Sequence, residues 1–296
     1  MQLAEGSVIT VVGAGQMGAG IAQVCAQRGF HVLLSDATIE RAVLGLAGIE
    51  QQLTRLSDKG KLSADEKAAA IARIEARIAE EAYPHSDLVI EAATENPGLK
   101  FSIFEKADQL AKPGAILASN TSSISITQLA GKTKRPERVI GMHFMNPVPV
   151  MKLVEIVRGL QTSEETLTVI RALGEKLGKT LITSQDRPGF LINRMLLPFV
   201  NEACFALEEG TGTPEDIDLG ARLGLNHPLG PFELADLIGL DTLLSIGEVL
   251  HSEFGDSKYR PAVLLRNLVA AGWLGRKTGR GFYRYDDKGN KLGRSL

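Results

Sequence analysis

Three short segments of the sequence carry side chains that suit acid–base chemistry. Ser122 lies among small polar residues, His143 opens the run His-Phe-Met-Asn-Pro, and Glu155 interrupts an apolar run. An imidazole titrates near neutral pH and can accept the proton of an alcohol. A carboxylate on the second ring nitrogen fixes the tautomer and stabilises the imidazolium that forms. The set therefore supplies a hydroxyl donor, an imidazole and a carboxylate, which suits acid–base chemistry on a substrate hydroxyl group.

A glycine motif near the amino terminus is suited to holding a dinucleotide. Gly13, Gly15 and Gly18 follow a short apolar run and open a helical pattern that continues to Arg28. The first glycine allows a tight turn, the second lets the backbone approach a pyrophosphate, and the third lets helix and strand pack closely. The helix N-terminus attracts the phosphates. A glycine-rich turn without a ligand is the alternative, but the strand before it and the helix after it favour a cofactor loop.

Asp36 follows Gly13 by about 20 residues, at the end of the second predicted strand. A carboxylate there can accept hydrogen bonds from the adenine-ribose hydroxyls of NAD and would repel the 2′-phosphate of NADP. Ala37 and Thr38 follow, with no arginine beside Asp36, so the sequence favours NAD. The alternative role for Asp36 is that of N-cap for the helix that follows.

The first half of the chain alternates short aliphatic runs with helical patterns, which predicts βαβ units and a parallel, doubly wound Rossmann-type sheet. Because the carboxyl ends of such strands line the ligand crevice, side chains distant in sequence can converge there. Ser119, Asn120 and Ser123 are predicted mainly to form a turn. The predicted strands are residues 8–12, 31–35, 88–91, 115–118, 139–143 and 153–157.

Two departures from the alternating pattern define the organisation of the chain. Residues 38–80 have helical spacing broken at Gly60, which predicts a hairpin of two long helices inserted in the sheet domain. Beyond residue 186 the pattern is helical to the end, as in residues 190–209 and 231–254. The polar residues 286–296 are expected to be loosely held. We therefore expect a NAD-binding Rossmann domain at 1–186 and an all-α domain for substrate binding and dimerisation at 187–296.

Composition restricts the partners and the compartment. The 296 residues include 44% hydrophobic and 23% charged residues with a net charge of −2, which gives no overall field for nucleic acid or an anionic membrane. The two cysteines, Cys25 and Cys204, form no disulfide framework and no metal-ligand spacing, so no metal is expected. No basic amino-terminal region with a signal-type apolar run and no apolar run of membrane-spanning length is present. These features predict a soluble cytoplasmic protein.

Five longer motifs resemble one family almost from end to end. The chain is similar to the L-3-hydroxyacyl-CoA dehydrogenases, and most like the bacterial 3-hydroxybutyryl-CoA dehydrogenases. The motifs are Gly-Ala-Gly-Gln-Met-Gly-Ala-Gly-Ile-Ala-Gln at 13–23, Ala-Ser-Asn-Thr-Ser-Ser at 118–123, Gly-Met-His-Phe-Met-Asn-Pro-Val-Pro-Val-Met-Lys-Leu-Val-Glu at 141–155, Pro-Gly-Phe-Leu-Ile-Asn-Arg at 188–194 and His-Pro-Leu-Gly-Pro at 227–231.

The resemblance implies a role for each matching residue. His143 matches the catalytic histidine, Glu155 the carboxylate that orients it, and Ser122 and Asn193 the polar groups that hold the reacting oxygen and the thioester. Lys59 matches a basic residue that meets coenzyme A; Gln52, on the same face, stands where a relative has serine. Positions matching the NAD pocket are Gly13, Gly15, Gln16, Met17, Gly18, Asp36, Glu95, Lys100, Ser122, Asn146 and Lys277. A solvated ion pair is an equal alternative for Glu95 and Lys100.

The function implied is the NAD-dependent interconversion of (S)-3-hydroxyacyl-CoA and 3-oxoacyl-CoA, with short chains such as 3-hydroxybutyryl expected first. A 3-hydroxyadipyl-CoA dehydrogenase of aromatic catabolism, a related sugar-acid dehydrogenase and a non-catalytic NAD-binding protein remain alternatives. The basic residues Lys59 and Lys61 disfavour the sugar-acid enzyme, and the complete polar set disfavours a non-catalytic protein. Apolar runs at 190–206 and 238–250, together with the resemblance, predict a homodimer.

Overall fold

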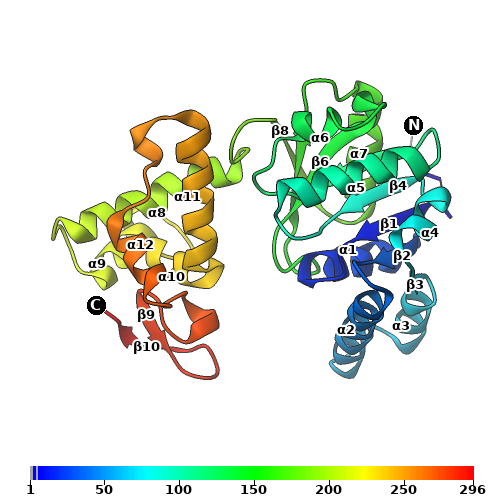
Figure 1. Cartoon of the computed structure of the whole chain (residues 1–296). Helices are drawn as coiled ribbons and strands as arrows, with labels where there is room; N and C mark the ends of the chain where they lie inside the picture. Colours follow the sequence, from blue (N-terminus) through cyan, green and yellow to red (C-terminus); the bar gives the residue numbers. More distant parts are fainter. Residues whose placement is uncertain (1–2, 5) are drawn as a thin grey trace. The chain divides into compact units, whose positions relative to one another are not determined.

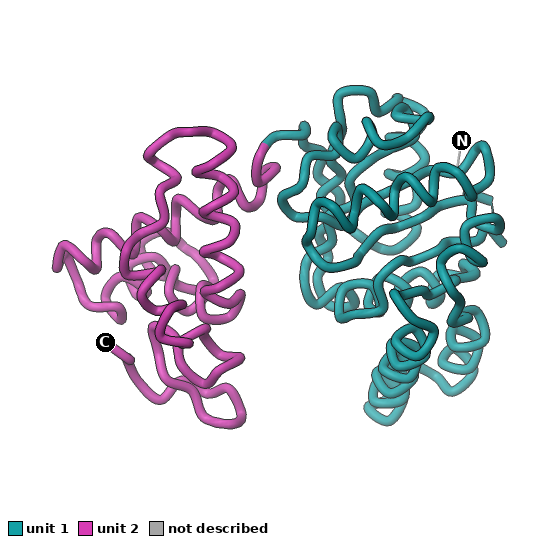
Figure 2. Tube along the Cα trace, viewed as in Figure 1, with its two compact units in different colours: residues 1–187 teal, residues 188–296 magenta. Residues whose placement is uncertain are grey.

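A computed structural model describes residues 3–4 and 6–296 of the chain. The chain divides into two compact units, Met1–Arg187 and Pro188–Leu296, shown in different colours in Figure 2. Each unit has its own buried apolar clusters.

The first unit is built on a twisted sheet with helices on both faces (Figure 1). Among the described residues, the strand order is β3-β2-β1-β4-β5-β6-β7-β8, and every neighbouring pair is parallel except β6 and β7. The first six strands follow the order of a dinucleotide-binding sheet. The strands are β1 Val8–Val12, β2 His31–Ser35, β3 Ile74–Ala76, β4 Leu88–Glu91, β5 Ile116–Ser119, β6 Val139–Phe144, β7 Leu153–Arg158 and β8 Thr180–Gln185.

Five α-helices in the described part of this unit begin at side chains that cap their first N–H groups. Thr38, Asn96, Ser125 and Ser163 each accept a hydrogen bond from a backbone N–H of the helix that follows. Ser63 forms a complete capping box with Glu66. The helices are α1 Gln16–Gln27, α2 Ile39–Asp58, α3 Ala64–Ile71, α4 Ala79–Ala82, α5 Pro97–Leu110, α6 Ile126–Ala130 and α7 Glu164–Lys176, with 3₁₀ turns η1 Tyr83–His85 and η2 Pro136–Arg138.

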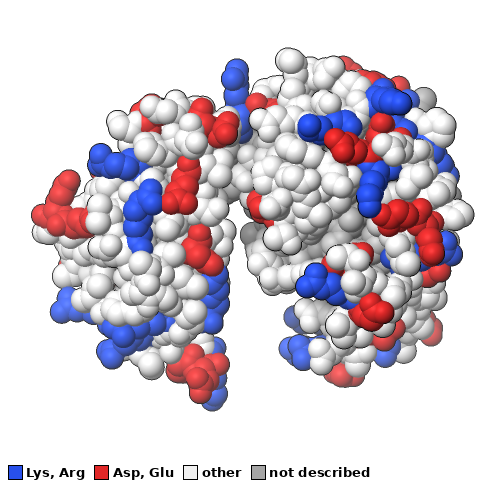
Figure 3. All heavy atoms as spheres, in the orientation of Figure 1, with Lys and Arg blue, Asp and Glu red and all other residues white. Residues whose placement is uncertain are grey.

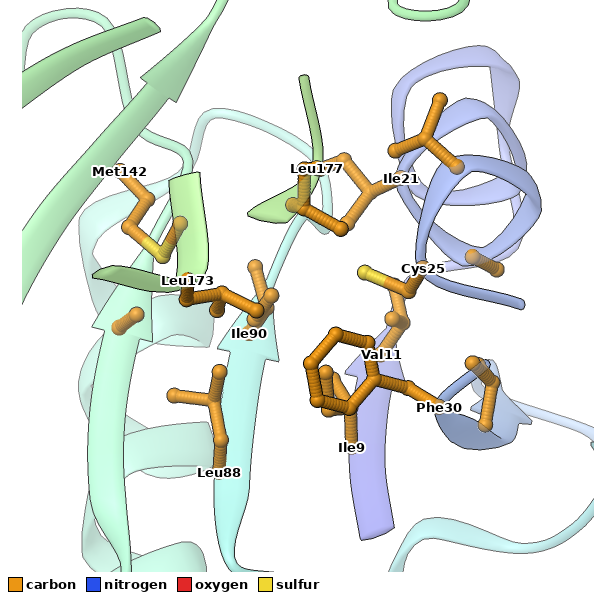
Figure 4. Close-up of a cluster of buried hydrophobic side chains, with 14 of the residues drawn as sticks. Ile9, Val11, Ile21, Cys25, Phe30, Leu88, Ile90, Met142, Leu173 and Leu177 are labelled. Carbon is orange, nitrogen blue, oxygen red and sulfur yellow. The ribbon is translucent and has the colours of Figure 1, made fainter. Parts of the chain in front are cut away.

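The core of this unit lies between the sheet and helices α1 and α7 (Figure 4). Ile9 and Val11 of β1 point toward this face, and the alternate residue Thr10 points to the opposite side, as strand geometry requires. Helices α5 and α6 contact β4, β5 and β6. The labelled side chains in Figure 4 are Ile9, Val11, Ile21, Cys25, Phe30, Leu88, Ile90, Met142, Leu173 and Leu177.

All six predicted strands are present, with bounds within one residue of those expected. The prediction of a wholly parallel sheet is wrong at one place, because β7 runs antiparallel to β6. Glu155 lies directly opposite His143 in this pair. Glu155 therefore lies near the amino end of its strand rather than at a carboxyl end. The sequence pattern also missed β8, because this edge strand is exposed or half-buried along its whole length and lacks an apolar run.

The insertion differs from the predicted pair of long helices. Helix α2 has 20 residues, but α3 has only 8, and the chain then returns to the sheet as the edge strand β3. The break at Gly60 is confirmed, with a φ of +66° that favours glycine. The short strand was missed because three residues give too little pattern to separate a strand from the end of a helix.

The second unit is mainly helical. Pro198 lies inside its longest helix, and Phe232, Leu240 and Phe282 are fully buried in its largest cluster. Its elements are α8 Ile192–Glu208, α9 Pro214–Leu219, the π-helical turn η3 Gly220–Gly224, α10 Pro231–Ile238, α11 Leu240–Phe254, η4 Ser257–Tyr259, α12 Val263–Ala270, η5 Arg276–Thr278, β9 Tyr283–Tyr285 and β10 Lys291–Arg294.

Two expectations for this unit need correction. The predicted helical run 231–254 is divided by Gly239, whose φ of +106° ends α10 and starts α11 in a new direction. The carboxyl-terminal residues are not simply loose, because β10 pairs antiparallel with β9. Tyr283 and Tyr285 of β9 are buried, which fixes this hairpin to the helices.

The surface carries mixed charge. On the face drawn in Figure 3, Lys and Arg side chains are interspersed with Asp and Glu side chains over each unit. Within residues 3–4 and 6–296, no helix is long and apolar enough to cross a membrane.

Candidate active site

The glycine loop between β1 and α1 has the close contacts that its motif predicts. Gly13 has a φ of +106°, and a Cβ atom there would lie 2.5 Å from the carbonyl oxygen of Ala92. A Cβ on Gly18 would lie 1.7 Å from the carbonyl oxygen of Gly13. A Cβ on Gly15 would meet no protein atom within 4 Å, and Gly15 lines a cavity. The turn, the packing and the open approach to the backbone therefore all fit a bound pyrophosphate.

The cavity beside this loop has a volume of about 910 Å³, at the upper end of the range for cofactor sites. One wall is the face of α2 that carries Leu44, Gly48 and Gln52. Residues 92–94 after β4 and residues 146–149 after β6 also line the cavity. The cavity therefore lies along the carboxyl ends of the strands, where a dinucleotide binds in this kind of sheet.

Asp36 lines the cavity and is held by the backbone around it. Its Oδ2 accepts a hydrogen bond from the N–H of Ala14 at 2.7 Å, and its Oδ1 accepts one from the N–H of Ala37 at 2.8 Å. The alternative role as helix cap is wrong, because Thr38 caps α2. Ala37 and Thr38 follow Asp36 in the sequence, but the fold brings Arg41, in the first turn of α2, to 3.7 Å from Asp36 Oδ1, and Arg41 also lines the cavity.

His143 and Glu155 meet across the antiparallel junction of the sheet. Register places the two residues opposite each other, and His143 Nδ1 lies 3.1 Å from Glu155 Oε2. Both are buried, with exposures of 7% and 0%. A carboxylate at Nδ1 favours the tautomer with a proton there, which leaves Nε2 as the nitrogen that can accept a proton.

Glu95 gathers the segment that carries Ser122. Its Oε1 accepts hydrogen bonds from Ser122 N at 3.0 Å, Ser123 N at 3.1 Å and Thr121 Oγ1 at 2.6 Å. Burial opposes ionisation of Glu95, but the charge of Lys100 and these hydrogen bonds outweigh it, so the pKa of Glu95 is lowered. Glu95 thus stays charged and holds the backbone on both sides of the half-buried Ser122.

Lys100 is not part of a solvated pair, because its side chain is only 1% exposed. Its Nζ lies 2.7 Å from Glu91 Oε1 and 3.3 Å from Glu95 Oε2. Glu91 is fully buried and was missed by the sequence reasoning. The available signal was an acidic residue at the end of an otherwise apolar strand, Leu88–Glu91.

The remaining predicted residues of this unit lie in three different places. Gln16, Gln52 and Asn146 are exposed and line the cavity, whereas Met17 packs against the apolar core. Lys59 is exposed at the end of α2, two turns beyond Gln52. The structure thus places Lys59 on the outward extension of a cavity wall.

Asn193 and Lys277 belong to the second unit. Asn193 is buried in the first turn of α8. Lys277 lies in η5, where its Nζ donates to both carboxylate oxygens of Asp241 at 2.6 Å. Burial of Asp241 is outweighed by this hydrogen bond and the backbone N–H of Thr242, so its pKa is lowered. Asp241 was not singled out from the sequence.

Known proteins are similar to the chain over nearly its full length. The family profile of the 3-hydroxyacyl-CoA dehydrogenase NAD binding domain matches residues 8–187, and the profile of the carboxyl-terminal domain matches residues 189–285. A probable 3-hydroxybutyryl-CoA dehydrogenase of Bacillus subtilis is 56% identical over 280 residues, covering 95% of this chain and 98% of that protein. The 3-hydroxybutyryl-CoA dehydrogenase of Bradyrhizobium diazoefficiens is 51% identical, covering 94% of each chain.

A solved structure gives the same result. The crystal structure of (S)-3-hydroxybutyryl-CoA dehydrogenase PaaH1 from Ralstonia eutropha is 52% identical, covers 95% of this chain and 99% of its own, and has a TM-score of 0.91. The predicted fold class, with a Rossmann-type sheet and a helical second domain, is confirmed. The chain belongs to the 3-hydroxyacyl-CoA dehydrogenase family and is an enzyme that uses NAD as its cofactor.

Proposed function

We propose that the chain interconverts (S)-3-hydroxyacyl-CoA and 3-oxoacyl-CoA with His143 as the general acid/base. The observation that carries this proposal is the buried pair of His143 and Glu155, joined at 3.1 Å in the unit that holds the glycine-lined cavity. Membership of a 3-hydroxyacyl-CoA dehydrogenase family supports the substrate class.

The protein side chains handle the proton of the substrate alcohol. In the oxidative direction, Nε2 of His143 accepts the hydroxyl proton, while Glu155 stabilises the positive charge that develops on the ring. Bound NAD supplies the hydride acceptor. In the reductive direction, Ser122 donates a hydrogen bond to the oxygen that gains charge, and His143 returns the proton. Asn193 serves the same oxygen or the thioester, as the family resemblance implies.

We infer that the preferred acyl chain is short, with 3-hydroxybutyryl-CoA first. One similar protein is named a 3-hydroxybutyryl-CoA dehydrogenase, at 51% identity, and two more are named probable 3-hydroxybutyryl-CoA dehydrogenases, at 52% and 56%. For coenzyme A itself we propose contacts with Gln52 and Lys59, since Lys59 is an exposed cation on the extension of the cavity wall. A dicarboxylic chain, as in 3-hydroxyadipyl-CoA, is the competing substrate.

Steady-state reduction of acetoacetyl-CoA with NADH and NADPH, followed by longer and dicarboxylic 3-oxoacyl-CoA substrates, tests this proposal. We expect the highest kcat/KM with acetoacetyl-CoA and NADH. Absence of turnover with every acyl-CoA would contradict the function. A higher kcat/KM for 3-oxoadipyl-CoA than for acetoacetyl-CoA would make the dicarboxylic chain the preferred substrate.

A homodimer formed by the second unit is also proposed. This unit exposes large apolar side chains that its own core does not cover, which is typical of an interface. They include Met195, Leu219, Leu223, Leu225, Leu237 and Val263. Light scattering at micromolar concentration should give twice the chain mass, and the Leu223→Asp variant should shift toward one chain mass. A single chain mass for the parent would contradict the dimer.

We propose a cytoplasmic location, because a reducing compartment suits the two free, buried cysteines Cys25 and Cys204. Fractionation of cells that express the full-length protein tests this, and recovery in an oxidising compartment would contradict it.

A further inference from the structure

Glu91 lies at the carboxyl end of β4 and is completely buried. Its Oε1 accepts hydrogen bonds from Lys100 Nζ at 2.7 Å and Ala93 N at 2.6 Å. Its Oε2 accepts one from Ser119 Oγ at 2.6 Å. One carboxylate thus joins the helix α5, the loop after β4 and the end of β5.

The first connection from Glu91 to the Ser122 segment runs through β5. Register pairs Glu91 with Ser119, and Asn120 N donates to the carbonyl oxygen of Glu91 at 2.7 Å. The same Ser119 hydroxyl that donates to Glu91 accepts a hydrogen bond from Thr121 N at 3.1 Å. Ser119 is therefore more than a turn former, because it transmits the position of the carboxylate to the residue before Ser122.

The second connection runs through Lys100. Its ammonium group lies between Glu91 Oε1, at 2.7 Å, and Glu95 Oε2, at 3.3 Å. Glu95 in turn accepts hydrogen bonds from the backbone N–H groups of Ser122 and Ser123. Both connections thus end on the same segment, residues 119–123.

Burial indicates what this arrangement supplies. A buried ion pair adds little stability, because the cost of removing two charges from water offsets their attraction. Fully hydrogen-bonded buried networks instead hold their members in one arrangement. Glu91 does not line the cavity, so it acts through its neighbours rather than on a ligand.

We propose that Glu91 is a positioning residue that sets the place of Ser122 through Ser119 and Lys100. This inference rests on the proposed function, in which Ser122 serves the reacting oxygen. A group that orients a hydrogen-bond donor for a developing charge affects kcat more than KM, because the contact strengthens in the transition state.

The chain offers a matched control at the other end of the sheet. Ser86, just before β4, is fully buried; its Oγ lies 2.6 Å from Thr10 Oγ1 and donates to the carbonyl oxygen of Ala82 at 3.0 Å. Ser119→Ala and Ser86→Ala each remove one fully buried hydroxyl with two hydrogen bonds, but only Ser119 leads to Ser122. A merely structural role for the Glu91 network would make the two variants alike.

The test compares the parent, Ser119→Ala, Ser86→Ala and Glu91→Gln in acetoacetyl-CoA reduction, thermal unfolding and amide exchange. We expect similar falls in Tm for the two serine variants. In Ser119→Ala, kcat should fall about tenfold while KM changes less than about threefold, and Ser86→Ala should stay within about twofold of the parent. Glu91→Gln should lose roughly 100-fold in kcat. Amide exchange at residues 121–123 should be faster in Ser119→Ala and Glu91→Gln than in Ser86→Ala.

Equal kcat in Ser119→Ala and Ser86→Ala would overturn the proposal. If Glu91→Gln does not fold, Ser119→Ala still decides the question, because it leaves no buried charge unpaired. A parent protein without acetoacetyl-CoA turnover would contradict the proposed function alone. Amide exchange then decides the positioning role, and unchanged protection of residues 121–123 in Ser119→Ala would overturn it.

Discussion

Both units bury carboxylates, but they surround them with different partners. In the second unit, Asp218 accepts hydrogen bonds from Phe232 N at 2.8 Å and Tyr283 Oη at 2.7 Å. Asp236 accepts from Phe282 N and Tyr283 N, both at 2.9 Å. These groups tie α9, α10 and β9 together. In the first unit, Glu155 faces the ring of His143, which can gain and lose a proton.

The difference shows that burial alone does not identify a functional acid. Asp218 and Asp236 receive backbone N–H and tyrosine donors, whose charge does not change near neutral pH, so they serve the structure. Glu155 is paired with a group whose charge changes in the proposed reaction, and its interaction strengthens as that charge appears. Substitutions in the two regions should therefore separate activity from stability.

The largest effect is expected for His143→Ala, which removes the proton acceptor. The kcat for acetoacetyl-CoA reduction should fall by roughly 10² to 10⁴-fold, with NADH affinity near that of the parent. Steady-state assays measure kcat, and a titration followed by NADH fluorescence measures the affinity for NADH. A large loss of Tm with normal specific activity would make His143 a structural residue like Asp218.

A smaller effect is expected for Asp36→Ala, which tests cofactor choice. Loss of a charged acceptor should lower kcat/KM for NADH by roughly 10- to 100-fold. The ratio of kcat/KM with NADPH to kcat/KM with NADH should rise. Arg41 then no longer faces a carboxylate 3.7 Å away and can bind a 2′-phosphate. The matched control is Glu40→Ala. Glu40 is an exposed acidic residue next to Arg41 in α2, and it does not line the cavity. An unchanged ratio in Asp36→Ala would remove Asp36 from the specificity determinants.

Lys59→Ala should have a modest effect confined to substrate binding. The KM for acetoacetyl-CoA should rise by about three- to tenfold with kcat preserved, as expected for an exposed cation that meets a distant phosphate. Lys134→Ala, another exposed lysine of the same unit, is the control and should leave KM unchanged. If KM is normal in Lys59→Ala, Arg55 and Lys61 become the next candidates for the coenzyme A contact.

The smallest effects concern the pH dependence of stability, where the two regions should have opposite signs. Burial raises the pKa of Asp236, so its contribution is fully present below about pH 3.8 and is lost as the pH rises through the folded-state value. The pKa of Glu95 is lowered, so its contribution is present above about pH 4.5 and is lost as the pH falls through the folded-state value.

Urea unfolding of the parent, Asp236→Asn and Glu95→Gln between pH 4 and pH 7 measures these contributions. On acidification, the free energy of unfolding of the parent should rise relative to that of Asp236→Asn. It should fall relative to that of Glu95→Gln. If the two differences in free energy of unfolding change in the same direction with pH, the proposed difference between the two carboxylates is contradicted.

Much of the first unit could be predicted from sequence because buried parallel strands give continuous apolar runs. Strands such as β1 and β4 therefore have the expected bounds, while the half-exposed β8 does not stand out. The glycine motif also carries its own geometry, since the close approaches of Gly13 and Gly18 are local.

The parts that escaped prediction depend on register between distant segments. Glu91 is buried because Ser119, 28 residues later, is aligned with it in the neighbouring strand and Lys100 turns back from α5. Glu155 was selected correctly as a partner for His143 by residue type and resemblance, but the antiparallel step that aligns them was not expected. Arg41 could have been anticipated, since the first turn of a helix after Thr38 places it near Asp36.

The central claim is that His143 and Glu155 act as one acid–base unit, and a double-mutant cycle tests it most directly. Acetoacetyl-CoA reduction is measured for the parent, His143→Ala, Glu155→Gln and the double variant, with Tm recorded for each. Glu155→Gln should lower kcat, because an amide cannot stabilise imidazolium charge, and the double variant should lose little more than His143→Ala alone. Losses that add in free energy, or normal activity in His143→Ala, would contradict the account.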